Sequence, residues 1–138
     1  MKLIVCVDDS FGILFNNRRL SRDSVVIDKI SEITEKSKLW VSEYSSELFS
    51  KGNICIDNKL YSKADADDYC FVEDLFNPKF LKSATELIIF KWNRKYPSDV
   101  KFPFESLAEK FSLTDSFEFI GNSHPKITMG VYSKCSKE

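Results

Sequence analysis

The sequence predicts an α/β domain in three layers: a mixed, mostly parallel central sheet, helices packed against it, and a C-terminal antiparallel hairpin. Two observations lead to this prediction. Short apolar runs typical of strands alternate with helical patterns through most of the chain, which then ends on two segments of alternating apolar and polar residues. A chain of 138 residues is long enough to bury a core without disulfides or metals, and we expect one domain over residues 1–138.

The first predicted elements are a strand and the longest helix. Residues 2–7 are a nearly continuous apolar run that ends at Asp8 and Asp9, which indicates a strand followed by a turn. Residues 21–36 carry valine and isoleucine at three- and four-residue steps, as an amphipathic helix does. Ser21 is the expected N-cap, and Asp23 lies where a carboxylate stabilises the positive end of the helix dipole.

The remaining elements are shorter. We expect strands at residues 38–42, 53–56, 69–72 and 86–92, with short helices at 45–50 and 78–83. The centre of the strand at 86–92 is fully apolar, as in strands covered on both faces of a sheet. Residues 63–68 form an acidic loop or helical turn, and residues 97–103 a second loop. Residues 111–120 and 127–132 alternate in polarity and form the closing antiparallel pair.

The composition excludes several classes of protein. Hydrophobic residues at 43% and charged residues at 30% exclude a disordered chain, and the apolar runs are too short to span a bilayer. A formal net charge of −1 argues against a dedicated nucleic-acid-binding protein. The chain contains 12 Phe but only 4 Gly, and it therefore has few of the glycine-rich loops that bind phosphate groups.

Cysteine and histidine usage bears on metal sites and on location. No two of the 4 cysteines have CxxC spacing, and His124 is the single histidine, so we expect no zinc site and no other metal centre. Met1 leads directly into the first predicted strand, without the apolar stretch of a signal peptide. We therefore expect a cytoplasmic protein with reduced thiols.

The order of these elements resembles that of dihydrofolate reductases. Residues 5–12 resemble the family's opening strand and the glycine-containing loop after it, and residues 71–87 resemble the strand, helix and strand of its cofactor-binding half. Phe102 and Pro103 resemble its Phe-Pro step, and residues 116–132 its final hairpin. The resemblance covers most of the chain and implies a dihydrofolate-reductase-like fold.

The positions at which this resemblance implies ligand contacts carry unexpected side chains. Glu43 stands where the family has an arginine for the cofactor phosphates, within residues 42–45. Glu73 and Asp74 stand where it has a Gly-Gly pair that approaches the pyrophosphate, and carboxylates repel such an anion. Phe90 lies near the position of a pterin-contacting threonine, and its bulk is expected to fill that space. We therefore expect no bound cofactor.

Asp23 corresponds to the acidic residue that protonates the pterin in that family. The Pro-Trp step expected before it is absent, and residues 16–20 read Asn-Asn-Arg-Arg-Leu instead. Two interpretations of Asp23 stand: a capping residue of the helix, or the catalytic acid of an NADPH-dependent, dihydrofolate-reductase-like oxidoreductase.

The chain also resembles a group of small bacterial proteins of poorly defined role. The similar segments lie within residues 5–23, 38–45, 92–99 and 121–128. Some members carry a ribonuclease label, but metal-dependent ribonucleases hold two metal ions with several His and Asp ligands. One histidine does not suffice for such a centre.

A small domain with an altered ligand site is similar to the immunity proteins that neutralise toxins of contact-dependent growth inhibition systems. The resemblance implies a non-catalytic protein whose partner is a basic toxin nuclease domain, without membrane or direct nucleic-acid binding. An acidic surface would attract such a partner, although a merely solubilising role for the acidic loop is the alternative. We expect the first strand's end and the acidic stretch to share one rim of the sheet. The candidate toxin-binding residues are Asp8, Asp9, Asp65, Asp67, Asp68, Glu73 and Asp74.

Overall fold

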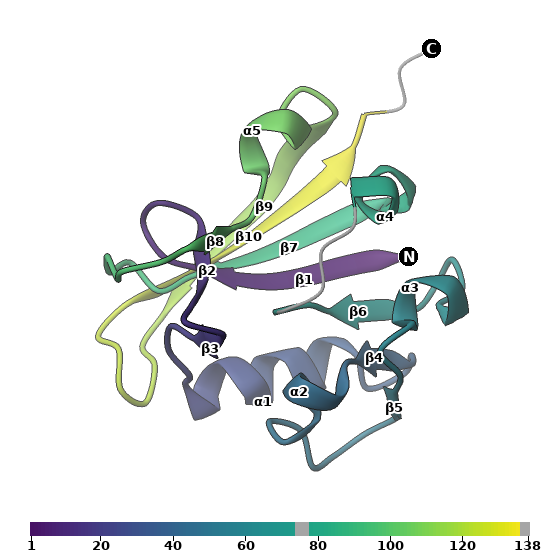
Figure 1. Cartoon of the computed structure of the whole chain (residues 1–138), viewed down its shortest axis with the longest axis horizontal. Coiled ribbons are helices and arrows are strands. Elements are labelled where there is room, and N and C mark those ends of the chain that lie inside the picture. The colour runs from purple at the N-terminus through teal and green to yellow at the C-terminus, as the bar shows by residue number, and fades with distance from the viewer. Residues whose placement is uncertain (74–77, 136–138) are drawn as a thin grey trace.

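The structure is a computed structural model that describes residues 1–73 and 78–135 of the chain. Within these residues a seven-stranded sheet has the strand order β5-β4-β6-β1-β7-β10-β9 (Figure 1). Its first five strands are parallel, and β10 and β9 are antiparallel to their neighbours. In sheet order the strands are β5 (Ile54–Ile56), β4 (Leu39–Val41), β6 (Tyr69–Phe71), β1 (Lys2–Val7), β7 (Glu86–Lys91), β10 (Ile127–Lys134) and β9 (Phe111–Phe119).

Both faces of the central strands are buried, which accounts for their continuous apolar sequence. Leu3 and Val5 belong to one core cluster, whereas Ile4 belongs to the other, because successive side chains of a strand point to opposite faces. Helix α1 (Ser24–Ile33) covers the face of Ile4. The opposite face is covered by α3 (Leu60–Lys63), α4 (Pro78–Ser83) and α5 (Phe104–Leu107). The predicted three-layer α/β fold is confirmed.

Helix α1 begins later than the sequence predicts. The N-cap is Asp23, whose Oδ1 accepts a hydrogen bond from the backbone N–H of Val25 at 2.9 Å, so the expectation that Ser21 caps the helix is wrong. The helix ends at Ile33, where Thr34 is the C-cap, instead of reaching residue 36. Val26 and Ile30 are its fully buried residues and form the predicted apolar face.

The sequence also missed a second, small sheet. Strands β2 (Gly12–Phe15), β3 (Arg18–Arg19) and β8 (Val100–Lys101) form three antiparallel strands in the order β3-β2-β8. Two of them have only two residues, too few for an alternating pattern to appear. Helix α2 (Glu43–Ser46) begins two residues before the predicted one. No helix in the described part of the chain is long and apolar enough to cross a membrane.

Candidate functional site

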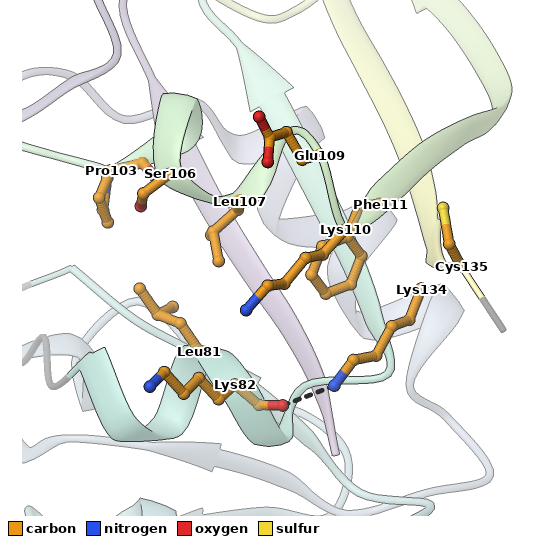
Figure 2. Close-up of a pocket in the computed structure, with 10 residues that line it drawn as sticks. All are labelled: Leu81, Lys82, Pro103, Ser106, Leu107, Glu109, Lys110, Phe111, Lys134 and Cys135. Carbon is orange, nitrogen blue, oxygen red and sulfur yellow. Dashed lines mark hydrogen bonds between the residues drawn. The ribbon is translucent and has the colours of Figure 1, made fainter. Parts of the chain in front are cut away.

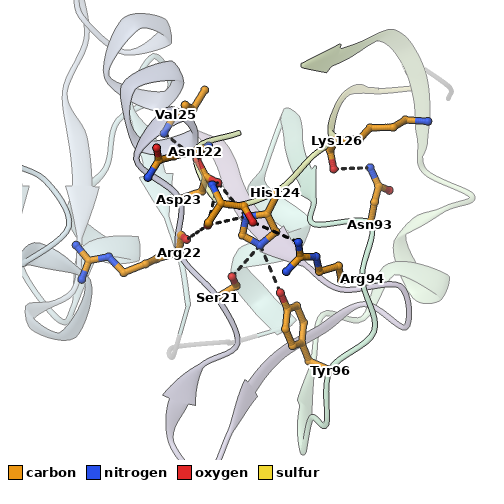
Figure 3. A network of polar contacts seen from close by, with 11 residues as sticks. Ser21, Arg22, Asp23, Val25, Asn93, Arg94, Tyr96, Asn122, His124 and Lys126 are labelled. Atoms are coloured by element: carbon orange, nitrogen blue, oxygen red, sulfur yellow. Dashed lines mark hydrogen bonds and ion pairs between the residues drawn. The ribbon is translucent and has the colours of Figure 1, made fainter. Parts of the chain in front are cut away.

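Asp23 lies at the centre of a buried polar network (Figure 3). Its Oδ1 accepts hydrogen bonds from the backbone N–H groups of Val25 and Asn122, at 2.9 and 2.8 Å. Its Oδ2 accepts from the backbone N–H of Ser123 at 2.9 Å, and the Nδ1 of His124 lies 2.9 Å from the same oxygen. Both oxygens of the carboxylate are therefore satisfied by the protein's own groups.

These contacts set the protonation state of Asp23. Burial alone would raise its pKa, but the hydrogen bonds from Asn122, Ser123, His124 and Val25 outweigh burial and hold the pKa well below its usual range. The carboxylate is therefore ionised at neutral pH. A proton-donating acid needs a pKa near the working pH, and Asp23 has the opposite shift.

His124 joins this carboxylate to a second set of side chains. Its ring is 3% exposed and stacks on Trp92, with the ring centroids 4.7 Å apart and the planes at 25°. Its Nε2 lies 2.9 Å from the Oγ of Ser21 and 3.4 Å from the hydroxyl of Tyr96. Ser21, His124 and Asp23 thus have the order and spacing of a Ser-His-Asp triad (Figure 3).

The loop over Asp23 needs a glycine. A Cβ atom placed on Gly121 would lie 2.5 Å from the Oδ2 of Asp23 and 2.7 Å from the side chain of Ile127. Only a residue without a side chain lets the backbone come this close to the carboxylate. The loop at residues 121–124 therefore covers the position at which the resemblance implies a pterin contact.

Glu73, a buried residue about fifty positions along the chain from Asp23, forms an ion pair with Arg19. The guanidinium of Arg19 donates from Nε to Oε2 at 2.9 Å and from an η nitrogen to Oε1 at 3.1 Å. Ser45 donates from Oγ to Oε1 at 2.8 Å. Arg19 also pairs with Glu47 at 3.2 Å and lies over the ring of Tyr44, 4.6 Å from its centroid. The negative charge of Glu73 is therefore balanced by Arg19, and both of its carboxylate oxygens accept hydrogen bonds.

The structure brings together the two segments at which the resemblance implies cofactor phosphates. Ser45, in α2, and Glu73, just after β6, are in direct contact. Glu43, by contrast, is exposed and accepts a hydrogen bond from Asn58. Burial, followed by the charge of Glu73, raises the pKa of the neighbouring Cys6 thiol, which is therefore not a reactive thiolate. In this region the guanidinium of Arg19 and the carboxylate of Glu73 are bound to each other.

Asp8 was predicted as a surface residue, and this prediction is wrong. The side chain is buried. Its Oδ1 accepts hydrogen bonds from the backbone N–H groups of Gly12 and Ser10, and its Oδ2 accepts one from that of Tyr96 at 2.9 Å. Burial raises its pKa, but the hydrogen bonds from Tyr96, Gly12 and Ser10 outweigh this effect and lower it. Asp8 holds the turn after β1 and is unavailable to a partner.

The acidic stretch is likewise only partly on the surface. Asp68 is buried. Its Oδ2 accepts hydrogen bonds from the indole N–H of Trp40 and the backbone N–H of Asp65, both at 2.9 Å. Asp65 and Asp67 are exposed, as is Asp9 near the end of β1. Asp68 and Glu73 thus have structural partners, which corrects the expectation that they face a toxin. Asp74 lies outside the described residues.

The expectation of one acidic rim is wrong for a topological reason. Strand β6 runs parallel to β1, with Tyr69 paired to Lys2. Residues that precede β6, such as Asp65 and Asp67, therefore lie at the end of the sheet where β1 begins, whereas Asp9 lies where β1 ends. The exposed carboxylates form two separate groups.

Phe90 is fully buried and belongs to the core cluster beneath α1. It packs edge-on against Phe119, with ring centroids 6.3 Å apart and an interplanar angle of 82°. The Phe90 side chain, in β7, is therefore part of the interior. Among the described residues, no group of three or more His, Cys, Asp or Glu side chains is placed to hold a metal ion.

A pocket of about 730 Å³ lies elsewhere, between α4, α5 and the ends of β9 and β10 (Figure 2). Its floor includes the buried side chains of Leu81, Leu107 and Phe111. Three lysines and one carboxylate, Glu109, surround it, and the Nζ of one lysine, Lys134, donates to the backbone carbonyl of Lys82. Such a pocket suits an apolar group with an anionic end, and its positive rim is unsuited to a basic protein.

The sequence did not reveal the partnership between Asp23 and His124, which are 101 residues apart. The available signals were the isolated histidine, which follows a Gly-Asn-Ser turn, and the missing Pro-Trp step before Asp23. Neither indicates a partner. The pairing of β10 with β7 fixes where the chain after residue 126 lies, and the hydrogen bonds from Asn122 and Ser123 to Asp23 place the loop at the start of α1.

Comparison with known proteins supports the fold. Solved structures similar to this chain include dihydrofolate reductase from Enterococcus faecalis, complexed with NADP(H) and RAB-propyl, with a TM-score of 0.66. The two chains are 8% identical over 97% of this chain and 96% of the reductase. No family model and no curated protein matches the sequence. The chain therefore has a dihydrofolate-reductase-like fold, and at this identity the likeness concerns the fold alone.

Proposed function

We propose that this protein is a non-catalytic immunity protein, which binds and neutralises the toxin nuclease domain of a contact-dependent inhibition system. One observation carries the proposal against a reductase: two of the positions at which the resemblance implies polar ligand contacts are taken by the protein's own groups. Asp23 is occupied by the loop at residues 121–124, and Glu73 by Arg19 and Ser45.

The Asp23 network disfavours a pterin ligand. A carboxylate that binds a ligand offers its oxygens to the ligand's donors, whereas Asp23 already accepts from three backbone N–H groups and lies beside His124. A competing ligand would have to displace this loop and leave buried N–H groups without acceptors, at a cost of about 1–3 kcal/mol for each group.

The Glu73 pair disfavours a phosphate-bearing cofactor. An incoming phosphate would meet a buried carboxylate of the same charge, and the arginine that could hold it already makes two hydrogen bonds to that carboxylate. Separating such a pair leaves an uncompensated buried charge. The residues present therefore do not fit a nicotinamide dinucleotide.

The exposed carboxylates support a basic protein partner. Nucleases carry basic surfaces because they bind a polyanion, and complementary charge speeds association with an acidic partner. Asp9, Asp65 and Asp67 remain exposed in the structure, and further exposed carboxylates lie after α1, at Glu35, and within β9, at Asp115 and Glu118. A protein that acts through its surface needs no open ligand site.

The test is co-expression with the toxin domain encoded by the neighbouring upstream gene. We expect a complex that co-purifies and relieves the growth defect, and no binding of NADPH in a fluorescence titration. Absence of a complex together with unrelieved toxicity contradicts the immunity role. A dissociation constant for NADPH in the micromolar range, or hydride transfer that Asp23→Asn abolishes, favours the reductase instead.

A second candidate is hydrolysis by Ser21. The 2.9 Å distances from Ser21 to His124 and from His124 to Asp23 favour it, since a nucleophilic serine needs a base that is held by a third group. Burial of the imidazole between Trp92 and Tyr96 favours a structural role. Labelling by a fluorophosphonate probe that Ser21→Ala abolishes would establish the hydrolase, and no labelling would exclude it.

A further inference from the structure

The exposed edge of the main sheet gives the clearest interaction surface on the described part of the chain. We propose that β9 accepts a strand from a basic partner protein, which then extends the sheet. The inference rests on the proposed function, because the partner is taken to be the basic toxin domain, and it names the surface of contact.

Strand β9 is the last strand of the sheet and pairs only with β10 among the described strands. It has nine residues, about 30 Å of extended chain, and residues 112–118 are all exposed. An edge strand presents unpaired backbone N–H and C=O groups on its free side. The opposite edge, β5, has three residues and offers far less backbone.

Apolar side chains accompany this free backbone. Phe117 is 46% exposed, and Ile120, directly after the strand, is 77% exposed. Phe117, Phe119 and Met129 line a groove of about 320 Å³ between β9 and α1. Phe117 pairs with Met129 across the ladder, so both point to the α1 face. A partner strand would bury these side chains as well as pair its backbone.

The charge of this surface favours a basic partner. Asp115 and Glu32 are exposed, and no basic side chain of the described residues forms an ion pair with either of them. Glu118 pairs with Lys126 at 3.1 Å, and the Nζ of Lys29 lies over the ring of Phe119. Lysine or arginine on a partner strand would find acceptors in Asp115 and Glu32.

The same features disfavour a second copy of this chain. In antiparallel self-pairing about the middle of β9, Asp115 would face its own counterpart, and like charges directly opposite are destabilising. The register with β10 also shifts between Val131 and Tyr132, and such an irregularity distorts the strand for a flat partner. Asp115 therefore contributes to specificity in two ways: it repels an identical strand, and it attracts a basic one.

The experiment measures binding of the upstream toxin domain by surface plasmon resonance, with hydrogen exchange of the complex. We expect Asp115→Lys and Phe117→Ser each to weaken binding at least tenfold, and amides within residues 111–119 to become protected. The matched control is Ile56→Ser, which removes an exposed apolar side chain, 56% exposed, from the opposite edge. It should bind like the wild type.

The outcomes separate this inference from the proposed function. If the wild type binds but the two β9 variants bind equally well, or protection falls elsewhere, the surface is wrong and the immunity role stands. If the wild type does not bind, both fail. An independent arm uses the protein alone: Asp115→Val should self-associate in sedimentation experiments where the wild type stays monomeric. A monomeric Asp115→Val, or a dimeric wild type, overturns the selectivity assigned to Asp115.

Discussion

Asp23 and Glu73 are both buried carboxylates at expected ligand positions, but they are held in different ways. Asp23 accepts chiefly from backbone N–H groups: that of Val25 in α1, and those of Asn122 and Ser123 in the loop that Gly121 allows to approach closely. Glu73 accepts chiefly from a charged side chain, Arg19. The comparison teaches that one site depends on backbone conformation, whereas the other depends on a single side chain that one substitution can remove.

Removal of Arg19 should have the largest effect. Arg19→Met leaves Glu73 buried without its counter-charge, and we expect a loss of about 3–5 kcal/mol in the free energy of unfolding. Urea denaturation at neutral pH measures this loss. The matched control is Arg18→Met at the exposed neighbouring position, which should change little. Arg19→Met combined with Glu73→Gln should recover much of the loss, and failure to recover would show that packing dominates.

Asp23→Asn should have the next largest effect, about 2–3 kcal/mol. An asparagine keeps one acceptor oxygen but loses the charge and meets backbone donors with its amide nitrogen. Urea denaturation again gives the difference, with the exposed Asp28→Asn in α1 as the matched control. Equal stability of the two variants would mean that the loop at residues 121–124 does not depend on the carboxylate.

The pH dependence of stability gives a smaller effect. The folded-state pKa of Asp23 lies below its unfolded value, so its contribution is present above the unfolded pKa near 4 and is lost as the pH falls towards the folded value. We expect urea midpoints to be flat above about pH 5 and to decline below about pH 4. Asp23→Asn should show a shallower decline, with the remaining slope including Asp8. An unchanged slope would contradict this.

Ser21→Ala should have the smallest effect, about 1 kcal/mol or less, because it removes one hydrogen bond at a half-buried position. Tyr96 remains beside the imidazole in this variant. Thermal unfolding checks the value, with Ser24→Ala at the exposed first position of α1 as a control. A loss above about 2 kcal/mol would mean that Ser21, and not Asp23 alone, holds His124 in place.

Much of the fold follows from the sequence, because local patterns determine it. The fully apolar centre of residues 86–92 predicted a strand covered on both faces, and the alternation of residues 111–120 predicted the closing pair. The site was harder to predict, since it depends on contacts between distant segments. The sequence led us to expect Asp65 and Asp9 on one rim, although Asp65 precedes β6 and Asp9 follows β1; the parallel pairing of Tyr69 with Lys2 puts them at opposite ends of the sheet. Asp8 and Asp68 look like surface carboxylates until their backbone and indole donors are known.

The contact between Asp23 and His124 also bears on the kinetics of folding. It joins residues 101 positions apart, and closing so long a loop costs conformational entropy before the contact stabilises anything. We expect this network to form after the folding transition state. Asp23→Asn should then raise the unfolding rate while the folding rate stays almost constant, as stopped-flow experiments in urea would reveal. The loop at residues 121–124 would in that case form its contacts late in folding and would set the lifetime of the folded state by slowing unfolding.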